Sequence, residues 1–235
     1  MNPADSPPRA SFDQFATNYD AELARGLSVS GEDKHYFAEG RIRWLQRRLH
    51  GLGARPARIL DFGCGTGGSV RLLLGLAGVR RVTGADISEA SLELARQEHV
   101  GLPADFRPLT VPPEEAAFDL VFCNGVFHHI PPEHRPGAMD YVRKSLKPGG
   151  LFALWENNPW NPGTQLVMSR IAFDREAVKI PPPGARALVR THGLEPLGQD
   201  FLFYLPRALA WFRPLEPWLS GLPLGAQYLT LARRR

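Results

Sequence analysis

The most informative segment of the chain is Ile59-Leu60-Asp61-Phe62-Gly63-Cys64-Gly65-Thr66-Gly67-Gly68-Ser69, in which an apolar run passes into a glycine-rich turn. The apolar residues are typical of a buried parallel strand. Glycines let the backbone adopt conformations closed to other residues and approach a ligand closely, because no Cβ stands in the way. A leucine-rich helix is expected from about Ser69, and its first N–H groups would face a ligand over the loop. The segment therefore predicts a nucleotide-binding loop between a strand and a helix.

A second apolar strand, Arg81-Val82-Thr83-Gly84-Ala85-Asp86-Ile87-Ser88, ends in an acid. In doubly wound sheets an acid at this place takes the ribose hydroxyls of a nucleotide. The alternative is that Asp86 caps the helix that starts near Ser88, although Ser88 could cap it itself. The loop alone leaves the nucleotide open, because Gly63, Gly65 and Gly68 also satisfy the G-x-G-x-x-G pattern of NAD-binding folds.

Two later segments narrow the choice of nucleotide. Residues 118–130 read as a fourth buried strand with a polar tip, and Leu146-Lys147-Pro148-Gly149-Gly150 reads as a turn feeding a fifth strand. Together, Asp-Phe-Gly-Cys-Gly-Thr-Gly, Ala-Asp-Ile-Ser, Phe-Asp-Leu-Val and Leu-Lys-Pro-Gly-Gly resemble the motifs of class I S-adenosylmethionine-dependent methyltransferases. The resemblance runs from about Phe12 to the C-terminus.

The resemblance and the order of segments imply an α/β fold that is Rossmann-like and doubly wound. We expect a mostly parallel seven-stranded sheet with an antiparallel last strand and an N-terminal helical lid. Residues 1–11 would be a disordered tail, and residues 12–235 a single methyltransferase domain with the lid at 12–50 and the core at 58–235. The strands are expected near 58–62, 82–86, 105–109, 120–124, 151–156, 197–205 and 228–233, with a helix at 185–192.

The cofactor implied by the resemblance is S-adenosylmethionine, bound at the carboxyl ends of the strands. Each predicted cofactor-binding residue has an expected place, namely the methionine moiety for Asp61, Gly63, Cys64, Gly65 and Gly67, the ribose for Asp86, the adenine for Ile87, the sulfonium for Asn124 and Val126, and the lid for Tyr19. Many relatives carry an acid after the third strand for the adenine amino group, and this sequence has none there. Thr110 or a backbone carbonyl could take that contact. We assign no metal-binding residue.

Methyl transfer needs a base only when the acceptor has a proton to lose. His128 and His129 follow the fourth strand, at a place where side chains would face the cofactor. Glu156 lies at the end of the fifth strand and would face the same pocket. One histidine could deprotonate a hydroxyl, with Glu156 orienting it or binding the acceptor. Structural alternatives stay open: His129 packs, His128 bonds a backbone carbonyl, or Glu156 caps the turn before Pro159.

Aromatic residues are concentrated between the last two strands, from Phe201 through Trp211 and Phe212 to Trp218. Such a segment needs burial somewhere. It could form the core of a subdomain, wall a hydrophobic acceptor pocket, form a homodimer interface, or touch a membrane surface without crossing it.

Composition agrees with one globular enzyme. The chain has 235 residues, of which 43% are hydrophobic, and it carries no apolar run long enough to span a membrane. Its N-terminus is proline-rich and polar rather than a signal peptide, and its two cysteines lie in the predicted nucleotide site, so we expect a cytoplasmic protein without disulfides.

The net charge is +4, but all except four of the 28 basic residues are arginine. The densest cluster, Arg41, Arg43, Arg47 and Arg48, reads as the solvated face of a helix rather than a nucleic-acid patch.

The sequence therefore predicts a methyltransferase that acts on a hydroxyl of a small-molecule acceptor, which could be hydrophobic. A methyltransferase acting on RNA or protein is the first alternative, although no continuous basic groove or recognition domain is evident. A nucleotide-binding redox protein is the second, although such enzymes normally add a substrate domain.

Overall fold

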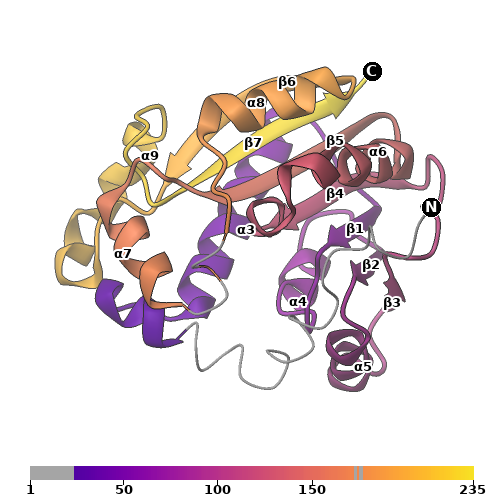
Figure 1. Cartoon of the computed structure of the whole chain (residues 1–235), viewed down its shortest axis with the longest axis horizontal. Helices are drawn as coiled ribbons and strands as arrows, with labels where there is room; N and C mark the ends of the chain where they lie inside the picture. Colours follow the sequence, from indigo (N-terminus) through magenta and orange to yellow (C-terminus); the bar gives the residue numbers. More distant parts are fainter. Residues whose placement is uncertain (1–23, 172–173, 175–176) are drawn as a thin grey trace.

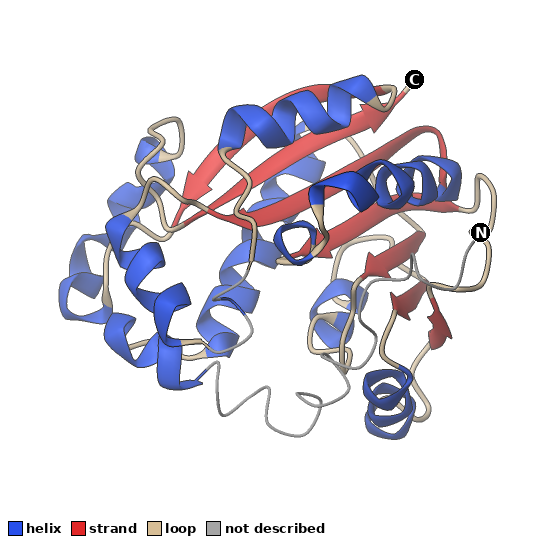
Figure 2. Ribbon diagram, in the orientation of Figure 1, coloured by secondary structure: helices blue, strands red, loops and turns tan. Residues whose placement is uncertain are grey.

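The computed structural model describes residues 24–171, 174 and 177–235. Its centre is a seven-stranded sheet in the order β3-β2-β1-β4-β5-β7-β6, with helices on both faces (Figures 1 and 2). β7 pairs antiparallel with both β5 and β6, whereas the other neighbouring strands pair in parallel. The predicted fold class is confirmed for the sheet.

The strands lie close to their predicted positions. Their bounds are β1 Arg58–Phe62, β2 Arg81–Asp86, β3 Ala104–Pro108, β4 Phe118–Asn124, β5 Leu146–Asn157, β6 Leu194–Leu202 and β7 Gln227–Arg234. The α-helices are α3 Lys34–Gly51, α4 Val70–Leu74, α5 Glu89–Glu98, α6 Arg135–Ser145, α7 Pro162–Arg170, α8 Pro182–Thr191 and α9 Glu216–Leu219. Short 3-10 helices are η2 Ser28–Ser30, η3 Phe127–His129, η4 Pro132–His134 and η6 Arg207–Leu215.

The central strands are apolar along their length because they are buried on both faces. Successive side chains of a strand point to opposite faces, so Ile59 and Leu60 of β1 enter different cores. The core around Leu60 is closed by α6 and α8, and the core around Ile59 by α3 and α4. Two packed layers of helix thus fix the sheet, and with it the ends of its strands.

The order of strands creates one switch point. From β1 the chain moves outward to β2 and β3, and it then returns to place β4 on the other side of β1. Phe62 at the end of β1 is in register with Ala85 of β2 and Cys123 of β4. The loops after these three strands therefore meet at one edge, which is where doubly wound sheets bind ligands.

Some local predictions need correction. The segment at Lys147-Pro148-Gly149-Gly150 is not a separate turn before the strand, because β5 already begins at Leu146, which pairs with Phe118 before a bulge in the ladder. The helix after the glycine-rich loop has only five residues, Val70–Leu74. Within the predicted lid at residues 12–50, the structure has the helix α3. Its apolar residues Ile42, Leu45 and Leu49 are buried, as expected.

The basic cluster on α3 is not a uniformly solvated face. Arg41 is buried and donates to the side chain of Gln227, and Arg48 forms an ion pair with Asp200. Only Arg43 and Arg47 project outward, from the exposed side of the helix. Half of the cluster thus stabilises the packing of α3 on the sheet, because a buried guanidinium needs acceptors around it.

The aromatic segment from Phe201 to Trp218 is only partly buried. Phe201 and Phe203, at the end of β6 and just after it, are buried. The rest folds into η6 and α9 at one end of the molecule, and neither contains a buried residue, so this part is not the core of a subdomain. No helix among the described residues is both long and apolar enough to cross a membrane.

Candidate active site

The glycine-rich loop after β1 is shaped by two close approaches. Gly63 has a φ of 74°, and a Cβ added there would lie 2.3 Å from a methyl group of Val126, in the loop after β4. A Cβ on Gly67 would lie 2.9 Å from the ring of His99. Gly65 has a φ of 53°, but a Cβ there would meet no described atom within 4 Å. The loop is therefore packed on the sides of Gly63 and Gly67 and open over Gly65.

Asp86 fastens this loop to the end of β2. One carboxylate oxygen accepts from the backbone N–H of Gly65 at 2.8 Å, and the other accepts from the N–H of Ser88 at 2.9 Å. Capping of α5 is done by Ser88, whose hydroxyl accepts from the N–H of Ser91. The alternative in which Asp86 caps the helix is therefore wrong. The neighbouring Ile87 is half-buried.

Asp61, just before the glycine-rich loop, has a carboxylate oxygen without a hydrogen-bond partner among the described residues. This oxygen is Oδ2, and the residue is buried. Burial and the nearby Asp86 carboxylate raise the pKa of Asp61 to about 7, although Arg41 opposes them. A cationic group placed beside Asp61 would satisfy this oxygen.

The other predicted cofactor residues fall into three groups. The Cys64 thiol packs against the backbone of β2, where it would lie 2.8 Å from a Cβ on Gly84, and burial raises its pKa well above the usual value. Asn124 ends β4 and lies beside Val126, so both are at the same edge as the glycine-rich loop. Tyr19 lies outside the described residues.

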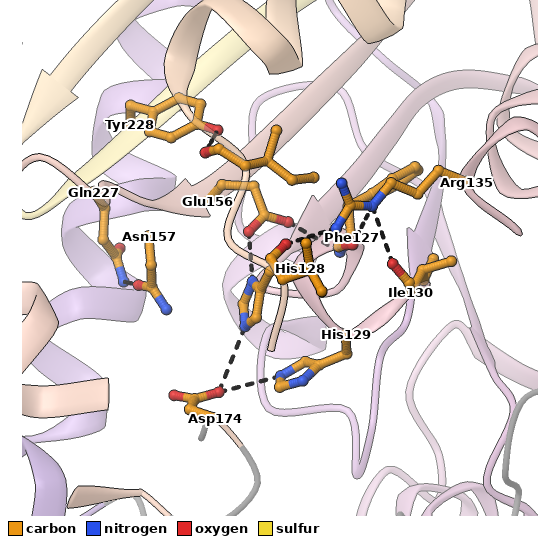
Figure 3. A network of polar contacts seen from close by, with 12 residues as sticks. Phe127, His128, His129, Ile130, Arg135, Glu156, Asn157, Asp174, Gln227 and Tyr228 are labelled. Atoms are coloured by element: carbon orange, nitrogen blue, oxygen red, sulfur yellow. Dashed lines mark hydrogen bonds and ion pairs between the residues drawn. The ribbon is translucent and has the colours of Figure 1, made fainter. Parts of the chain in front are cut away.

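His128 and Glu156 form a buried pair (Figure 3). The Nδ1 of His128 lies 2.5 Å from Oε2 of Glu156, while Oε1 of Glu156 accepts from the N–H of Phe127 at 2.9 Å. Glu156 thus orients a histidine, as one of its predicted roles required, and the alternative of a cap before Pro159 is wrong. His128 bonds carboxylates rather than a backbone carbonyl.

Asp174 joins the two histidines from the opposite side. Its Oδ1 lies 3.5 Å from Nε2 of His128 and 3.3 Å from Nε2 of His129, and the two rings are 4.1 Å apart (Figure 3). Arg135 supports this arrangement by donating to the carbonyls of Phe127 and Ile130.

The carboxylates give the two histidines different protonation states. Burial opposes a charge on His128, but Glu156 and Asp174 outweigh it and raise its pKa to about 9. Burial lowers the pKa of His129 despite its contact with Asp174, and the positive charge of His128 adds to that effect. At neutral pH His128 is therefore the cation of the network and His129 its neutral imidazole.

A cavity of about 110 Å³ adjoins this network. Its polar lining includes His128, His129, Asp174 and Asn124. Its apolar lining, which we call the apolar wall, consists of Leu27, Phe37, Val167, Met168 and Ile171. Lys34 and Arg41 also line it, and neither was predicted from the sequence. Arg41 was interpreted as part of the solvated basic cluster, and Lys34 carried no signal of its own.

The cluster of His128, His129 and Asp174 also satisfies the spacing of metal ligands, with one potential ligand atom of each within 4.8 Å of the others. A metal ion there would have to displace the proton that Glu156 and Asp174 hold on His128. The protonated imidazole already supplies a positive charge between the two carboxylates.

Comparisons with known proteins agree with this architecture. Residues 59–150 match the family described as a methyltransferase domain. The chain is 31% identical over 222 residues to a ubiquinone biosynthesis O-methyltransferase of Bordetella bronchiseptica, covering 86% of this chain and 88% of that protein. It is 30% identical over 119 residues to a trans-aconitate 2-methyltransferase of Methylobacterium nodulans, covering 51% of this chain and 45% of that protein.

Among solved structures, the fold matches a Haloferax volcanii methyltransferase in a complex with the Trm112 activator. The TM-score is 0.63 at 20% identity, covering 95% of this chain and 97% of that chain. The sheet order, the glycine-rich loop and the acid after β2 define a Rossmann-like methyltransferase. The chain belongs to the class I S-adenosylmethionine-dependent methyltransferases, and its cofactor is S-adenosylmethionine. A redox protein, the second alternative from the sequence, is thereby set aside.

The residues present fit this cofactor. S-adenosylmethionine carries an ammonium group, and the unpartnered, buried Oδ2 of Asp61 calls for a cation. Its methionine moiety needs to approach a backbone free of side chains, and the open side of Gly65 provides one.

Proposed function

We propose that this enzyme methylates a hydroxyl oxygen of a small molecule bound in the cavity beside His128, His129 and Asp174. The observation that carries the proposal is the cavity itself, which joins an apolar wall to a polar network at the end of β4. The two relatives named above are enzymes of small-molecule acceptors by their names, which favours a small molecule over RNA or protein. The apolar wall favours an acceptor with a hydrophobic body.

We further propose how the chain would hold the cofactor, which supplies a methyl group activated on a sulfonium sulfur. Asp61 would receive the ammonium group, and the Asp86 carboxylate would accept from the ribose hydroxyls. The loop at Gly63, Cys64, Gly65 and Gly67 would lie along the methionine moiety. Ile87 would contact the adenine, Asn124 and Val126 would lie beneath the sulfonium, and Tyr19 would belong to the lid.

His129 is the proposed general base. It borders the cavity, and its lowered pKa keeps it neutral at pH 7, so it can accept a proton from a hydroxyl. If Nε2–H donates to Oδ1 of Asp174, the lone pair on Nδ1 is the one that accepts. His128 is already protonated at that pH and would hold Asp174 in place. Glu156 would in turn fix His128 and the turn at Phe127.

The test is a screen of hydroxylated metabolites for methyl incorporation from labelled S-adenosylmethionine, followed by His129→Gln on the best acceptor. General-base assistance is worth about 10²–10⁴-fold, so we expect kcat to fall by that order while the Kd for the cofactor stays unchanged. His192→Gln is the matched control, because that residue follows α8 directly and its ring bonds the carbonyl of Leu188. A His129→Gln enzyme with wild-type kcat would exclude His129 as the base.

A carboxylate acceptor is the second candidate, because Lys34 and Arg41 place two cationic side chains along the same cavity. A carboxylate is already ionised at neutral pH and needs no base. Methylation of carboxylic acids that persists in His129→Gln and is lost in Lys34→Gln would favour this candidate over the hydroxyl.

A further inference from the structure

The segment formed by η6 and α9 turns the charged groups of Arg213 and Glu216 inward and its large apolar side chains outward. A surface helix of a protein that meets only water does the reverse. This segment lies at one end of the molecule (Figure 1).

The inward charges are firmly held. Arg213 forms an ion pair with Glu32 at 2.9 Å, and its guanidinium lies 4.4 Å from the centre of the Tyr36 ring. It also donates to the carbonyl of Leu205. Glu216 accepts from the N–H groups of Tyr204 and Leu205. These bonds fix the orientation of the segment, so its apolar side chains cannot turn inward without breaking them.

The outward side chains are large and well exposed. Trp218 is 88% exposed and Trp211 75%, and the Trp211 ring centroid is 4.0 Å from that of Phe212. We call the exposed apolar side chains of η6 and α9 the tryptophan ridge, which consists of Leu209, Trp211, Phe212, Leu215 and Trp218. None of them lines the cavity, so the ridge is not a wall of the acceptor site.

The charges around the ridge favour an anionic partner. Arg207, at the start of η6, is exposed and contacts the carbonyl of Gly31 next to η2. The acidic Glu32 and Glu216 on this side are both engaged inward. The chain as a whole carries a net charge of +4.

We propose that the tryptophan ridge is a docking surface for an anionic lipid membrane, to which the protein binds peripherally. Tryptophan is favoured at such interfaces because its ring enters the acyl boundary while its N–H reaches the headgroups. The exposed Arg207 at the start of η6 would add attraction to anionic headgroups. This inference goes beyond the proposed function and does not depend on the identity of the acceptor.

The experiment is flotation of the full-length protein with vesicles of phosphatidylcholine, alone or mixed with phosphatidylglycerol. We expect binding to the mixed vesicles that weakens with added salt. The double variant Trp211→Ser/Trp218→Ser should lose about tenfold or more of that affinity. Brominated acyl chains should quench the tryptophan fluorescence of the wild type more than that of the double variant.

Val100→Ser is the matched control, because Val100 is 81% exposed and lies just after α5, away from η6 and α9. It should bind vesicles like the wild type. Circular dichroism and cofactor binding would show that the double variant is folded. The proposal is overturned if the wild type does not bind mixed vesicles, or if the folded double variant binds them equally well. It is also overturned if the ridge instead mediates a dimer, seen by sedimentation as self-association without vesicle binding that the double variant abolishes.

Discussion

Replacing Asp61 by asparagine should change both the pH dependence of stability and the affinity for the cofactor. Burial and the Asp86 carboxylate raise the pKa of Asp61 from an ordinary 3.8 to about 7 in the folded protein. A carboxyl whose pKa is raised on folding stabilises the protein only while it is protonated. That contribution is complete below about pH 4 and is lost as the pH rises through about 7.

The size of the effect follows from that pKa difference. At about 1.4 kcal/mol for each pKa unit, the rise from 3.8 to about 7 corresponds to about 4 kcal/mol of stability lost between acid and alkaline pH. About 2–3 kcal/mol of this loss falls between pH 5 and pH 8. Asp61→Asn cannot ionise, so its free energy of unfolding should lack this part of the pH dependence.

Urea unfolding of the cofactor-free protein at several pH values measures the effect directly. The loss between pH 5 and pH 8 should be about 2–3 kcal/mol smaller in Asp61→Asn than in the wild type. Asp105→Asn is the control, because Asp105 is an exposed acid paired with Arg81. An equal loss in wild type and Asp61→Asn would refute the reasoning. Calorimetry should also show cofactor affinity rising about tenfold from pH 6 to pH 8 in the wild type alone, since the ammonium group needs the ionised carboxylate.

Three further predictions concern the loop and its anchor. Asp86→Ala should weaken S-adenosylmethionine binding by roughly 1.5–3 kcal/mol in calorimetry, and should also lower the melting temperature because two backbone N–H groups lose their acceptor. Gly65→Val should abolish binding, since its side chain would enter the open side of the loop. Gly63→Ala should destabilise the protein by about 1–3 kcal/mol in urea, because its Cβ would meet Val126 at 2.3 Å, whereas Gly51→Ala, whose Cβ meets no described atom within 4 Å, should not. Unchanged affinity in the first two variants, or equal stability of the last two, would contradict the assigned geometry.

The sequence could predict the sheet because its information is local. Buried strands are continuous apolar runs, and a glycine-rich turn after the first of them has few other uses, so the positions of β1, β2 and β4 follow from neighbouring residues. The same is true of Asp61, Asp86 and Asn124, which stand where strands end. The early start of β5 was missed because the packing of the sheet, not residue propensity, sets element boundaries.

The candidate site beyond those strand ends depends on contacts that no local pattern records. Asp174 meets His128 and His129 only because the chain after α7 returns to the end of β4, and that contact divides the two histidines into a cation and a neutral imidazole. The exposure of Trp211 and Trp218 could not be predicted either. A run of aromatic residues indicates that the segment packs against something, but not whether that is the protein core or another molecule. The sequence by itself thus determined the strands and the glycine-rich loop, which follow from local polarity and backbone freedom. Tertiary structure alone decided protonation and exposure, because both depend on which distant charges and surfaces the fold brings together.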